Sequence, residues 1–305
     1  MTLETSTKTG TSVAVIIVSY NSSDYLSKCL EHVRAQTWQP DRVIVIDNNS
    51  TEQASLEQLK GLTAVELIRL SDNVGYGGAI NRAVDKIRGI DFIATLNPDA
   101  FPDANWLESL MTAAALYPRC GSFASLTVKA KDKNKIDGAG DILHISGVPW
   151  RRFHNKLISE SNLVNEPVFS ACAGAALFRL TSFRQVGGFD ESFFMYVEDV
   201  EICYRAESRG MRTGYLPSII SSHSSRGGEG MSRIAVNHTL KNQKIFLSRR
   251  HGKLFSISAI TISSLFCIVY GLLGSMLLFP FGRFRRSSVN LLLGGIDFIG
   301  NSSRT

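Results

Sequence analysis

Short apolar runs recur through the first hundred residues of the chain, and polar side chains follow each of them. The runs are Val13–Ser19, Val43–Ile46, Val65–Leu70 and Phe92–Leu96. The first, second and fourth are continuously apolar, which is typical of strands whose two faces are both covered. The pattern therefore predicts four strands, of which at least three are buried.

Apolar residues recur three or four positions apart between these runs, within residues 26–37 and 79–87, and after the last run, within residues 106–114. That spacing places them along one face of a helix. Asn21 and Ser22 are available to cap the first of these helices, and Pro118 follows the last. Strands that alternate with helices predict an α/β fold with a doubly wound, mostly parallel sheet flanked by helices.

Polar side chains stand at the carboxyl ends of the predicted strands, the edge at which an open parallel sheet binds its ligands. The first strand ends at Ser19, Tyr20 and Asn21, and the second ends at Asp47. Both ends carry groups able to hold a nucleotide. The sequence therefore predicts a nucleotide pocket at this edge.

The fourth strand stops at Asn97-Pro98-Asp99. Pro98 cannot extend a strand and biases Asn97 towards an extended conformation, so the amide and the carboxylate leave the sheet at a defined angle. The Asp99 carboxylate is a hard-oxygen ligand suited to Mg²⁺ or Mn²⁺ carrying a diphosphate. Taken alone, the tripeptide favours an ordinary turn, and the remaining motifs reverse that preference.

A glycine-rich segment that begins at Asn73 follows the third strand. A dinucleotide fingerprint starting at Gly75 would need glycine at the position of Ile80, and it would follow the first strand. The dinucleotide interpretation therefore fails. Gly75 and Gly77 would instead let backbone N–H groups approach a phosphate or ribose, and a tight turn is the alternative.

The regular pattern breaks up from Lys129 to Leu163 into charged, glycine and aromatic residues, which we interpret as an excursion over the substrate face. Arg151 and Arg152 in this stretch are candidate partners for an anionic group. A solvated basic loop explains them equally well.

An aromatic run delivers Glu198 and Asp199 to the start of a predicted helix. Helix N-termini stabilise carboxylates, so simple capping is the alternative, but capping needs only one acid. A cleft walled by aromatic side chains would limit solvation, a setting in which a carboxylate serves as a general base. The pair is therefore the predicted catalytic site.

His223 begins a Ser/Gly-rich stretch that also contains Arg226. A lone histidine is more often structural, but one at the start of a flexible loop has no core to satisfy. We interpret His223 as a metal ligand and Arg226 as a residue that closes on a diphosphate.

Taken together, these motifs resemble a known family. In chain order they are Val18-Ser19-Tyr20-Asn21, Asp47-Asn48-Asn49-Ser50, Asn73-x-Gly75, Asn97-Pro98-Asp99, Gly187-Gly188-Phe189-Asp190, Glu198-Asp199 and His223. The set resembles the family-2 inverting glycosyltransferases with a GT-A fold, and most of all their bacterial rhamnosyltransferase branch. The resemblance covers roughly Val13 to Phe246.

The resemblance implies a role for each matched residue. Asp47 would contact the nucleobase, and Ser19 to Asn21 with Asn73 would line the nucleotide pocket. Asp99 and His223 would hold a divalent metal, and Asp199 would be the base with Glu198 in support. Asn97 stands where many members have the first Asp of a DxD motif, and this substitution suits a branch that uses Asn-Pro-Asp.

The implied reaction is metal-dependent, inverting transfer of a sugar. Rhamnose, carried by a donor such as dTDP-rhamnose, is the first candidate, and Mg²⁺ or Mn²⁺ is the implied cofactor. The acceptor would be a hydroxyl of a glycan or of a polyprenyl-linked glycan in cell-surface polysaccharide synthesis. No nucleic acid partner is expected.

Charge and hydropathy divide the 305-residue chain into three parts: a polar tail over 1–12, predicted to be disordered, a catalytic domain over 13–248, and a C-terminal part over 249–305. Residues 254–282 contain no charged side chain, and basic residues flank them within a chain of net charge +6. This pattern predicts membrane-associated helices at the cytoplasmic face, spanning or interfacial, with a buried helix pair as the alternative. The five cysteines form no CxxC pair and predict reduced thiols.

Two rival functions fit parts of the sequence. A non-catalytic nucleotide-sugar-binding membrane module would not need two adjacent acids at Glu198 and Asp199. A nucleotidyltransferase would carry a glycine-rich, basic loop after its first strand, where this chain has Ser19-Tyr20-Asn21.

Overall fold

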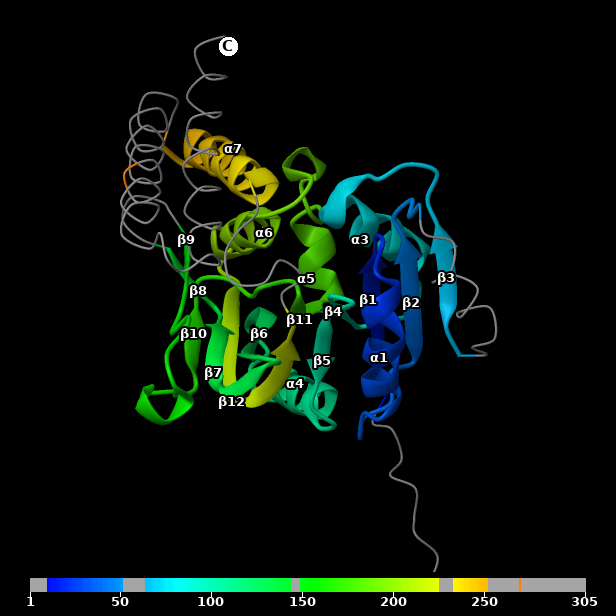
Figure 1. Cartoon of the computed structure of the whole chain (residues 1–305), viewed down its shortest axis with the longest axis horizontal. Coiled ribbons are helices and arrows are strands. Elements are labelled where there is room, and N and C mark those ends of the chain that lie inside the picture. The colour runs from blue at the N-terminus through cyan, green and yellow to red at the C-terminus, as the bar shows by residue number, and fades with distance from the viewer. Residues whose placement is uncertain (1–9, 52–63, 144–148, 225–232, 252–268, 270–305) are drawn as a thin grey trace, which may run out of the picture.

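A central mixed sheet with helices on both faces forms the protein (Figure 1). The computed structural model describes residues 10–51, 64–143, 149–224, 233–251 and 269. The strands are β1 Val13–Ser19, β2 Arg42–Asp47, β3 Glu66–Arg69, β4 Phe92–Leu96, β5 Ala100–Pro102, β6 Cys120–Lys129, β7 Asp132–Ala139, β8 Asp141–Leu143, β9 Pro149–Arg151, β10 Glu166–Val168, β11 Ala175–Arg179 and β12 Arg212–His223. The helices are α1 Ser23–Arg34, α3 Gly75–Lys86, α4 Trp106–Leu116, α5 Leu180–Gln185, α6 Glu198–Glu207 and α7 Arg233–His251, with short 3-10 helices η1 Ile158–Glu160 and η2 Glu191–Phe193.

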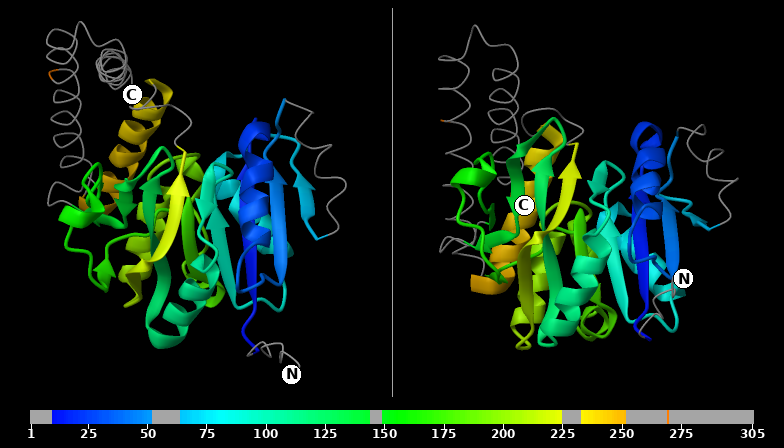
Figure 2. Two further views of the ribbon diagram at one scale, coloured as in Figure 1. Left: turned by 60° about the horizontal axis from the view of Figure 1, so that its bottom comes forward. Right: turned by 90° about the horizontal axis from the view of Figure 1, so that it is seen from below.

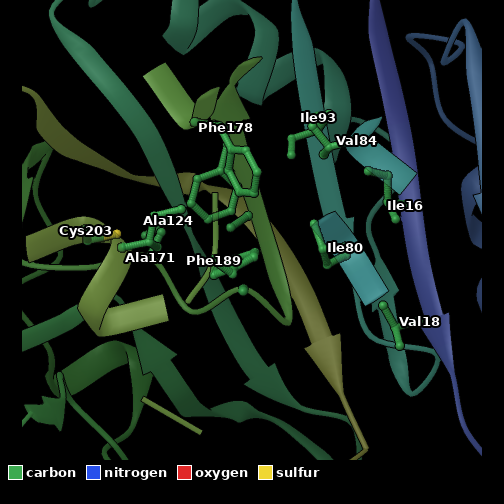
Figure 3. Close-up of a cluster of buried hydrophobic side chains, with 14 of the residues drawn as sticks. Ile16, Val18, Ile80, Val84, Ile93, Ala124, Ala171, Phe178, Phe189 and Cys203 are labelled. Carbon is green, nitrogen blue, oxygen red and sulfur yellow. The ribbon is translucent and has the colours of Figure 1, made fainter. Parts of the chain in front are cut away.

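The four strands predicted from the sequence form one parallel half of the sheet, in the order β4-β1-β2-β3. Every side chain of β1 is buried, as its continuous apolar pattern predicts. Alternate residues of β1 point to opposite faces: Ile16 packs against α3 on one face, and Ile17 packs with α1 and α4 on the other. Figure 3 shows Ile16 and Val18 facing Ile80 and Val84 of α3.

The prediction of a mostly parallel sheet is wrong for the second half of the molecule. The full order is β10-β12-β6-β11-β4-β1-β2-β3, and β11 lies antiparallel between β4 and β6. β6 pairs in parallel with the long strand β12, while β5, β7 and β10 add short antiparallel pairs. The fold is therefore mixed α/β.

The last described helix, α7, packs beside α6 on the C-terminal half of the molecule (Figures 1 and 2). A small cluster of buried side chains joins the two helices to η2; its members are Phe193, Val197, Val200, Phe246 and Leu247. The predicted end of the catalytic domain at residue 248 falls inside α7, which continues to His251.

Both predicted tails lie largely outside the described residues. Ser12, which the sequence placed in the predicted tail, hydrogen bonds Asp91 through its backbone N–H (2.8 Å) and hydroxyl (2.9 Å), so this residue is held against the domain. Residues 254–282 are described only at Val269. Among the described helices, none is both long and apolar enough to cross a bilayer. The four described cysteines are free thiols.

Candidate active site

The ends of β1 and β2 lie side by side because the two strands pair in parallel, with Ser19 opposite Asp47. Both side chains are buried. The Asp47 carboxylate accepts a hydrogen bond from the Ser50 backbone N–H (3.0 Å), which folds the chain back after β2. The Ser19 hydroxyl has no hydrogen-bond partner among the described residues. These two predicted pocket residues are thus brought together.

Asn48 organises this edge of the sheet, although the sequence analysis gave it no role of its own. Its Nδ2 donates to the Asn73 side-chain oxygen (2.9 Å) and to the Gly75 carbonyl (3.2 Å), and its Oδ1 accepts from the Val74 N–H (3.0 Å). The Asn73 oxygen in turn accepts from the Gly75 N–H (3.0 Å). Asn48 therefore ties the end of β2 to the start of α3.

The end of β1 is also held by hydrogen bonds. Asn21 has a positive φ of 48°, which asparagine tolerates better than most residues. Its side-chain oxygen accepts from the Thr51 N–H (2.9 Å), and its own N–H donates to the Ser50 hydroxyl (3.0 Å). Tyr20 is 43% exposed beside it. Tyr20 is thus the accessible member of this strand end.

The start of α3 is closed by another segment of the chain. Gly75 has φ +77°, and a Cβ there would lie 2.2 Å from the Phe194 carbonyl oxygen. That oxygen accepts a hydrogen bond from the Tyr76 N–H at 2.7 Å. Hence Gly75 and Tyr76 already give their N–H groups to protein oxygens. Close packing of the chain against Phe194 is one physical reason for glycine at position 75.

Asn97 and Asp99 leave the sheet between β4 and β5. The Asn97 N–H donates to the Gly174 carbonyl (2.8 Å), and a Cβ on Gly174 would come within 2.9 Å of the Asn97 amide. Asp99 is buried, at 6% exposure, and its carbonyl accepts from the Ser224 N–H (2.9 Å). This last bond brings the end of β12 against the Asn97-Pro98-Asp99 turn.

His223, the last residue of β12, lies between two carboxylates. Its Nε2 is 3.4 Å from Asp99 Oδ1, and its Nδ1 is 3.3 Å from Asp137 Oδ2. Burial lowers the pKa of His223, but the two carboxylates outweigh burial and raise it to about 9. The side chain is only 17% exposed. His223 therefore has a buried, charged environment, contrary to the expectation that it has no core to satisfy.

Asp137 on β7 extends the cluster and was not anticipated. The Arg151 guanidinium donates to Asp137 Oδ2 at 2.9 Å. Burial raises the pKa of Asp137, but the hydrogen bond from His223 and the charge of Arg151 outweigh burial and lower it to about 2. Arg151 also lies within electrostatic reach of Asp199. Asp137 and Arg151 thus connect the predicted metal residues with the predicted base.

The two arginines of the central excursion have different environments. Arg151 retains 42% of its side-chain exposure at the cluster, whereas Arg152 is 10% exposed. Arg152 forms an ion pair with Glu166 and donates to the Ala139 carbonyl (2.9 Å). Arg151 alone therefore remains a candidate for contact with an anionic group.

Glu198 and Asp199 begin α6, as predicted. Asp199 Oδ2 accepts from the Ala173 N–H (3.2 Å) and Oδ1 from the Val200 N–H (2.9 Å), while Glu198 Oε2 has no hydrogen-bond partner among the described residues. Burial, with the charge of Asp199, raises the pKa of Glu198 to about 8, and burial also raises the pKa of Asp199. Two crowded carboxyls in little water are the setting of a general base.

A third acid, Asp141, belongs to the same group. It is 6% exposed and accepts a hydrogen bond from the Ser170 hydroxyl at 2.8 Å. Burial and the charge of Asp199 raise the pKa of Asp141 to about 7. The residue lies just after β7, where the sequence shows only a charged, glycine-rich stretch.

A family model described as glycosyl transferase family 2 matches residues 14–187, which include the strand ends, Asp99 and Asp137. The chain belongs to glycosyl transferase family 2. A second model, glycosyl transferase family group 2, matches residues 139–281. The resemblance drawn from the sequence motifs is confirmed, and this family-2 chain is a glycosyltransferase.

Two relatives of this glycosyltransferase are rhamnosyltransferases. The N-acetylglucosaminyl-diphospho-decaprenol L-rhamnosyltransferase of Mycobacterium tuberculosis is 28% identical over 264 residues, which are 78% of this chain and 84% of the relative. The rhamnosyltransferase WbbL of Escherichia coli K12 is 30% identical over 224 residues, which are 69% of this chain and 83% of the relative.

Solved structures share the fold. The structure of GalNAc-T7 with UDP, GalNAc and Mn²⁺ has a TM-score of 0.63 at 17% identity and covers 79% of this chain, which spans 48% of its length. The mannosyltransferase PcManGT of Pyrobaculum calidifontis with GDP-Man and Mn²⁺ has a TM-score of 0.60 at 13% identity, covering 95% of this chain and 87% of its own. The mixed α/β fold matches these GT-A glycosyltransferases.

The structure of this glycosyltransferase supplies a partial test of the implied metal. Among the described residues, no three His, Cys, Asp or Glu side chains form a group able to hold a metal ion. Asp99 Oδ1 and His223 Nε2 nevertheless lie 3.4 Å apart, so a carboxylate oxygen and an imidazole nitrogen are together at this strand end as two ligands that would suit Mg²⁺ or Mn²⁺. Diphosphate oxygens and water commonly complete such sites. Arg226 lies outside the described residues.

Proposed function

We propose that this family-2 glycosyltransferase transfers a sugar, with rhamnose as the first candidate, from a nucleotide-diphosphate donor such as dTDP-rhamnose. The acceptor would be a hydroxyl of a glycan or a polyprenyl-linked glycan in cell-surface polysaccharide synthesis. The observation that carries the proposal is the continuous cluster in which Asp137 and Arg151 connect His223 and Asp99 with Asp199. Similarity to two rhamnosyltransferases supports the choice of sugar.

The strand ends would hold the donor nucleotide. Asp47 would accept hydrogen bonds from the nucleobase. The buried Ser19 hydroxyl has no hydrogen-bond partner among the described residues, so it would bond the nucleotide without losing a protein contact. The side-chain oxygens of Asn21 and Asn73 already accept hydrogen bonds from backbone N–H groups. These two residues would therefore shape the pocket and would not bond the nucleotide through those oxygens. Tyr20, which is 43% exposed, and Gly75 complete the predicted pocket.

Asp99 and His223 would hold the divalent ion, which when bound supplies positive charge beside the diphosphate as the sugar bond breaks. Asn97 lies next to Asp99 at the same strand end, where its amide would face the diphosphate. Arg151 is the described cation placed to contact an anionic group at this cluster. Arg226 is proposed for the same task from the sequence alone.

Asp199 would act as the general base. It would take the proton of the acceptor hydroxyl while that oxygen bonds to the anomeric carbon, and the nucleoside diphosphate would leave with the electrons of the broken C–O bond. Attack opposite the leaving group inverts the anomeric centre. Burial raises the pKa of Asp199, so that it binds the proton more readily, and Glu198 and Asp141, whose own pKa values are raised, interact with it.

We also propose that the enzyme works at the cytoplasmic face of the cell membrane. The support is the uncharged stretch 254–282 with its basic flanks, which follows α7 in the sequence and would place the active site beside a lipid-linked acceptor. Removal of the residues after Gly252 is expected to preserve donor binding and to lower transfer to a lipid-linked acceptor. Full-length protein found wholly in the soluble fraction without detergent would contradict the membrane proposal.

The direct test is a panel of nucleotide sugars, with and without Mg²⁺ or Mn²⁺, offered with a polyprenyl-diphosphate-linked acceptor. We expect metal-dependent release of a nucleoside diphosphate and an inverted linkage in the product by NMR. Pyrophosphate release would instead indicate nucleotidyl transfer. Binding without release from any donor would support a non-catalytic module, a function that membership of this family already disfavours.

A further inference from the structure

The segment that leads into Glu198 and Asp199 has an unfavourable backbone conformation. Phe194, Tyr196 and Val197 have positive φ angles of 57°, 68° and 71°. The left-handed region is unfavourable for residues other than glycine, most of all for a β-branched valine. Such conformations persist only where the surroundings enforce them, and they cluster at functional sites. The contacts that enforce this one therefore bear on the position of both acids.

One side of the segment is held by α3. The Phe194 carbonyl accepts from the Tyr76 N–H at 2.7 Å. The Tyr76 hydroxyl donates to the Ala173 carbonyl at 2.6 Å, and the N–H of that same Ala173 donates to Asp199. Tyr76 thus fixes both the segment before the acids and the loop that contacts Asp199.

The other side is held by one residue of α7. Asn242 is fully buried, at 0% exposure, and its Nδ2 lies 2.6 Å from the Phe193 carbonyl, 2.8 Å from that of Met195 and 2.8 Å from that of Tyr196. The amide shares its two N–H donors among these three oxygens. We name this set of hydrogen bonds the carbonyl clamp. Asn242 Oδ1 has no partner among the described residues, so the side chain is committed to the clamp.

Neighbouring residues of α7 pack on the same segment without making these bonds. The His238 and Phe194 rings stack with centroids 5.6 Å apart, and Phe246 packs with Phe193 in a buried cluster. These contacts join α7 to the segment through apolar and ring surface. The carbonyl clamp differs from them because hydrogen bonds to three carbonyls within four residues constrain the φ and ψ angles of the backbone between them.

We infer that Asn242 is a positioning residue for the reaction, which acts by holding the backbone of residues 193–197 so that Glu198 and Asp199 enter the site in the correct orientation. This inference rests on the proposed role of Asp199 as the base. Asn242 lies in α7, within the second family match over residues 139–281, and contacts the site only through main-chain oxygens. The alternative is that Asn242 merely anchors α7 to the domain.

The test uses the full chain with Asn242→Leu, which fills similar space without a donor, and with Leu240→Ala as the matched control. Leu240 is a buried α7 residue, at 4% exposure, so its truncation loosens the packing of α7 and leaves the clamp bonds intact. Three quantities are measured for each protein: kcat and KM for transfer, the Kd of the donor nucleotide, and amide hydrogen exchange over residues 193–199.

For Asn242→Leu we expect kcat to fall by about 100-fold, the loss that a misplacement of about 1 Å causes, with the nucleotide Kd unchanged. Exchange over 193–199 should become faster. For Leu240→Ala we expect a lower Tm, normal exchange in that segment and kcat near wild type. Asn242→Ser, which keeps one donor, should have an intermediate kcat and replaces the leucine variant if that variant does not fold.

Unchanged kcat or unchanged exchange in Asn242→Leu would overturn the inference. Equal losses of kcat in Asn242→Leu and Leu240→Ala would show that Asn242 only anchors α7, and would overturn it too. If the wild-type enzyme transferred no sugar from any donor, the proposed function would fail, and the exchange measurement would still decide whether the clamp exists.

Discussion

The two halves of the site are built on opposite physical principles. At the ends of β1 and β2, most polar side chains bond one another and nearby backbone groups: Asn48, Asn73 and Asn21 all have protein partners, and the Ser19 hydroxyl is an exception among the described residues. Around Asp199, by contrast, buried carboxyls lie close together: Asp199 and Asp141 accept hydrogen bonds, but Glu198 Oε2 has no partner among the described residues. We call the strand-end residues the stable half of the site, because their hydrogen bonds stabilise the fold. We call Glu198, Asp199 and Asp141 the acid half, because burying these carboxyls together is unfavourable.

This difference follows what each half must do. A nucleotide pocket benefits from groups fixed before the ligand arrives, because ordering them on binding would cost affinity. A general base benefits from burial and like charges that raise its affinity for a proton. The strained backbone of residues 194–197 lies in the second half as well, which agrees with the tendency of strain to gather at functional sites.

The largest effect should come from the acid half. Asp199→Asn keeps the shape of the side chain and removes its ability to take a proton. We expect transfer to fall by about 10²–10⁴, the usual contribution of general-base assistance, while donor binding persists. Steady-state kinetics with a separate nucleotide binding measurement checks this, with Asp85→Asn on exposed α3 surface as the control. Loss of donor binding in Asp199→Asn would make the residue structural.

The next effect concerns the proposed metal residues. Asp137 faces Nδ1 of His223 while Asp99 faces Nε2, so Asp137 would orient the histidine as an outer carboxylate does at metal sites. We expect Asp137→Asn to weaken Mg²⁺ binding by about 10–100-fold in the presence of a nucleoside diphosphate. His223→Ala should weaken it at least as much.

The measurement belongs at a pH above the His223 pKa of about 9, because a protonated histidine cannot bind the ion and Asp137→Asn would also relieve that competition. Calorimetric titration reads the affinity directly. Asp132→Asn, on the more exposed end of β7, is the control. Wild-type Mg²⁺ affinity in both His223→Ala and Asp137→Asn would exclude His223 as a ligand.

In the stable half, the sharpest prediction concerns Asn48. Its side chain is 3% exposed and makes three hydrogen bonds to the start of α3, so Asn48→Ala leaves buried groups without partners. We expect a loss of about 1–3 kcal/mol in the free energy of unfolding. Urea unfolding with the exposed Asn134→Ala as a control measures it. If stability were unchanged, the hydrogen bonds of the stable half would not stabilise the fold as described above.

The same contrast explains what could be predicted from the sequence. β1, β2 and β4 contain continuous apolar runs that are followed by polar residues, a pattern that can be recognised from neighbouring residues alone. The start of α6 at Glu198 was equally readable, because the pair of acids stands where an apolar helical face begins. Both kinds of signal lie within a few neighbouring residues.

The missed features depend on contacts between distant parts of the chain. Asp137 meets His223 only because β7 and β12 both pair with β6, and its charged, glycine-containing stretch looks like a loop. β11 runs antiparallel between β4 and β6, a pairing that no local pattern records. Asn242 is a single polar residue in a helix, and its neighbours in the sequence do not indicate that it bonds three carbonyls of residues 193–196.

The last prediction concerns the pH dependence of stability that Glu198 confers. Burial and the charge of Asp199 raise the pKa of Glu198 from 4.5 in the unfolded chain to about 8. Between these values the folded protein keeps a proton that the unfolded chain releases, so stability is full at low pH and falls as pH rises towards 8. Glu198→Gln removes this contribution. We expect the difference in free energy of unfolding, variant minus wild type, to grow in favour of the variant across that window.

The difference between the two unfolding curves reports on Glu198 together with its interaction with Asp199, because the charge of Asp199 is one cause of the Glu198 shift. The other groups with shifted pKa values are present in both proteins. The pKa of His223 is raised to about 9 and that of Asp141 to about 7. The contribution of each group to the free energy of unfolding therefore falls with rising pH in both proteins. Urea unfolding at a series of pH values gives the two curves. A constant difference across the window would mean that Glu198 ionises at its ordinary pKa, and the acid half would then be less frustrated than its crowding indicates. A difference that grows with pH would show that the buried proton on Glu198 lowers the free energy of unfolding as pH rises. The hydrogen bonds around Asn48 involve no such proton, so the two halves of the site differ in this respect.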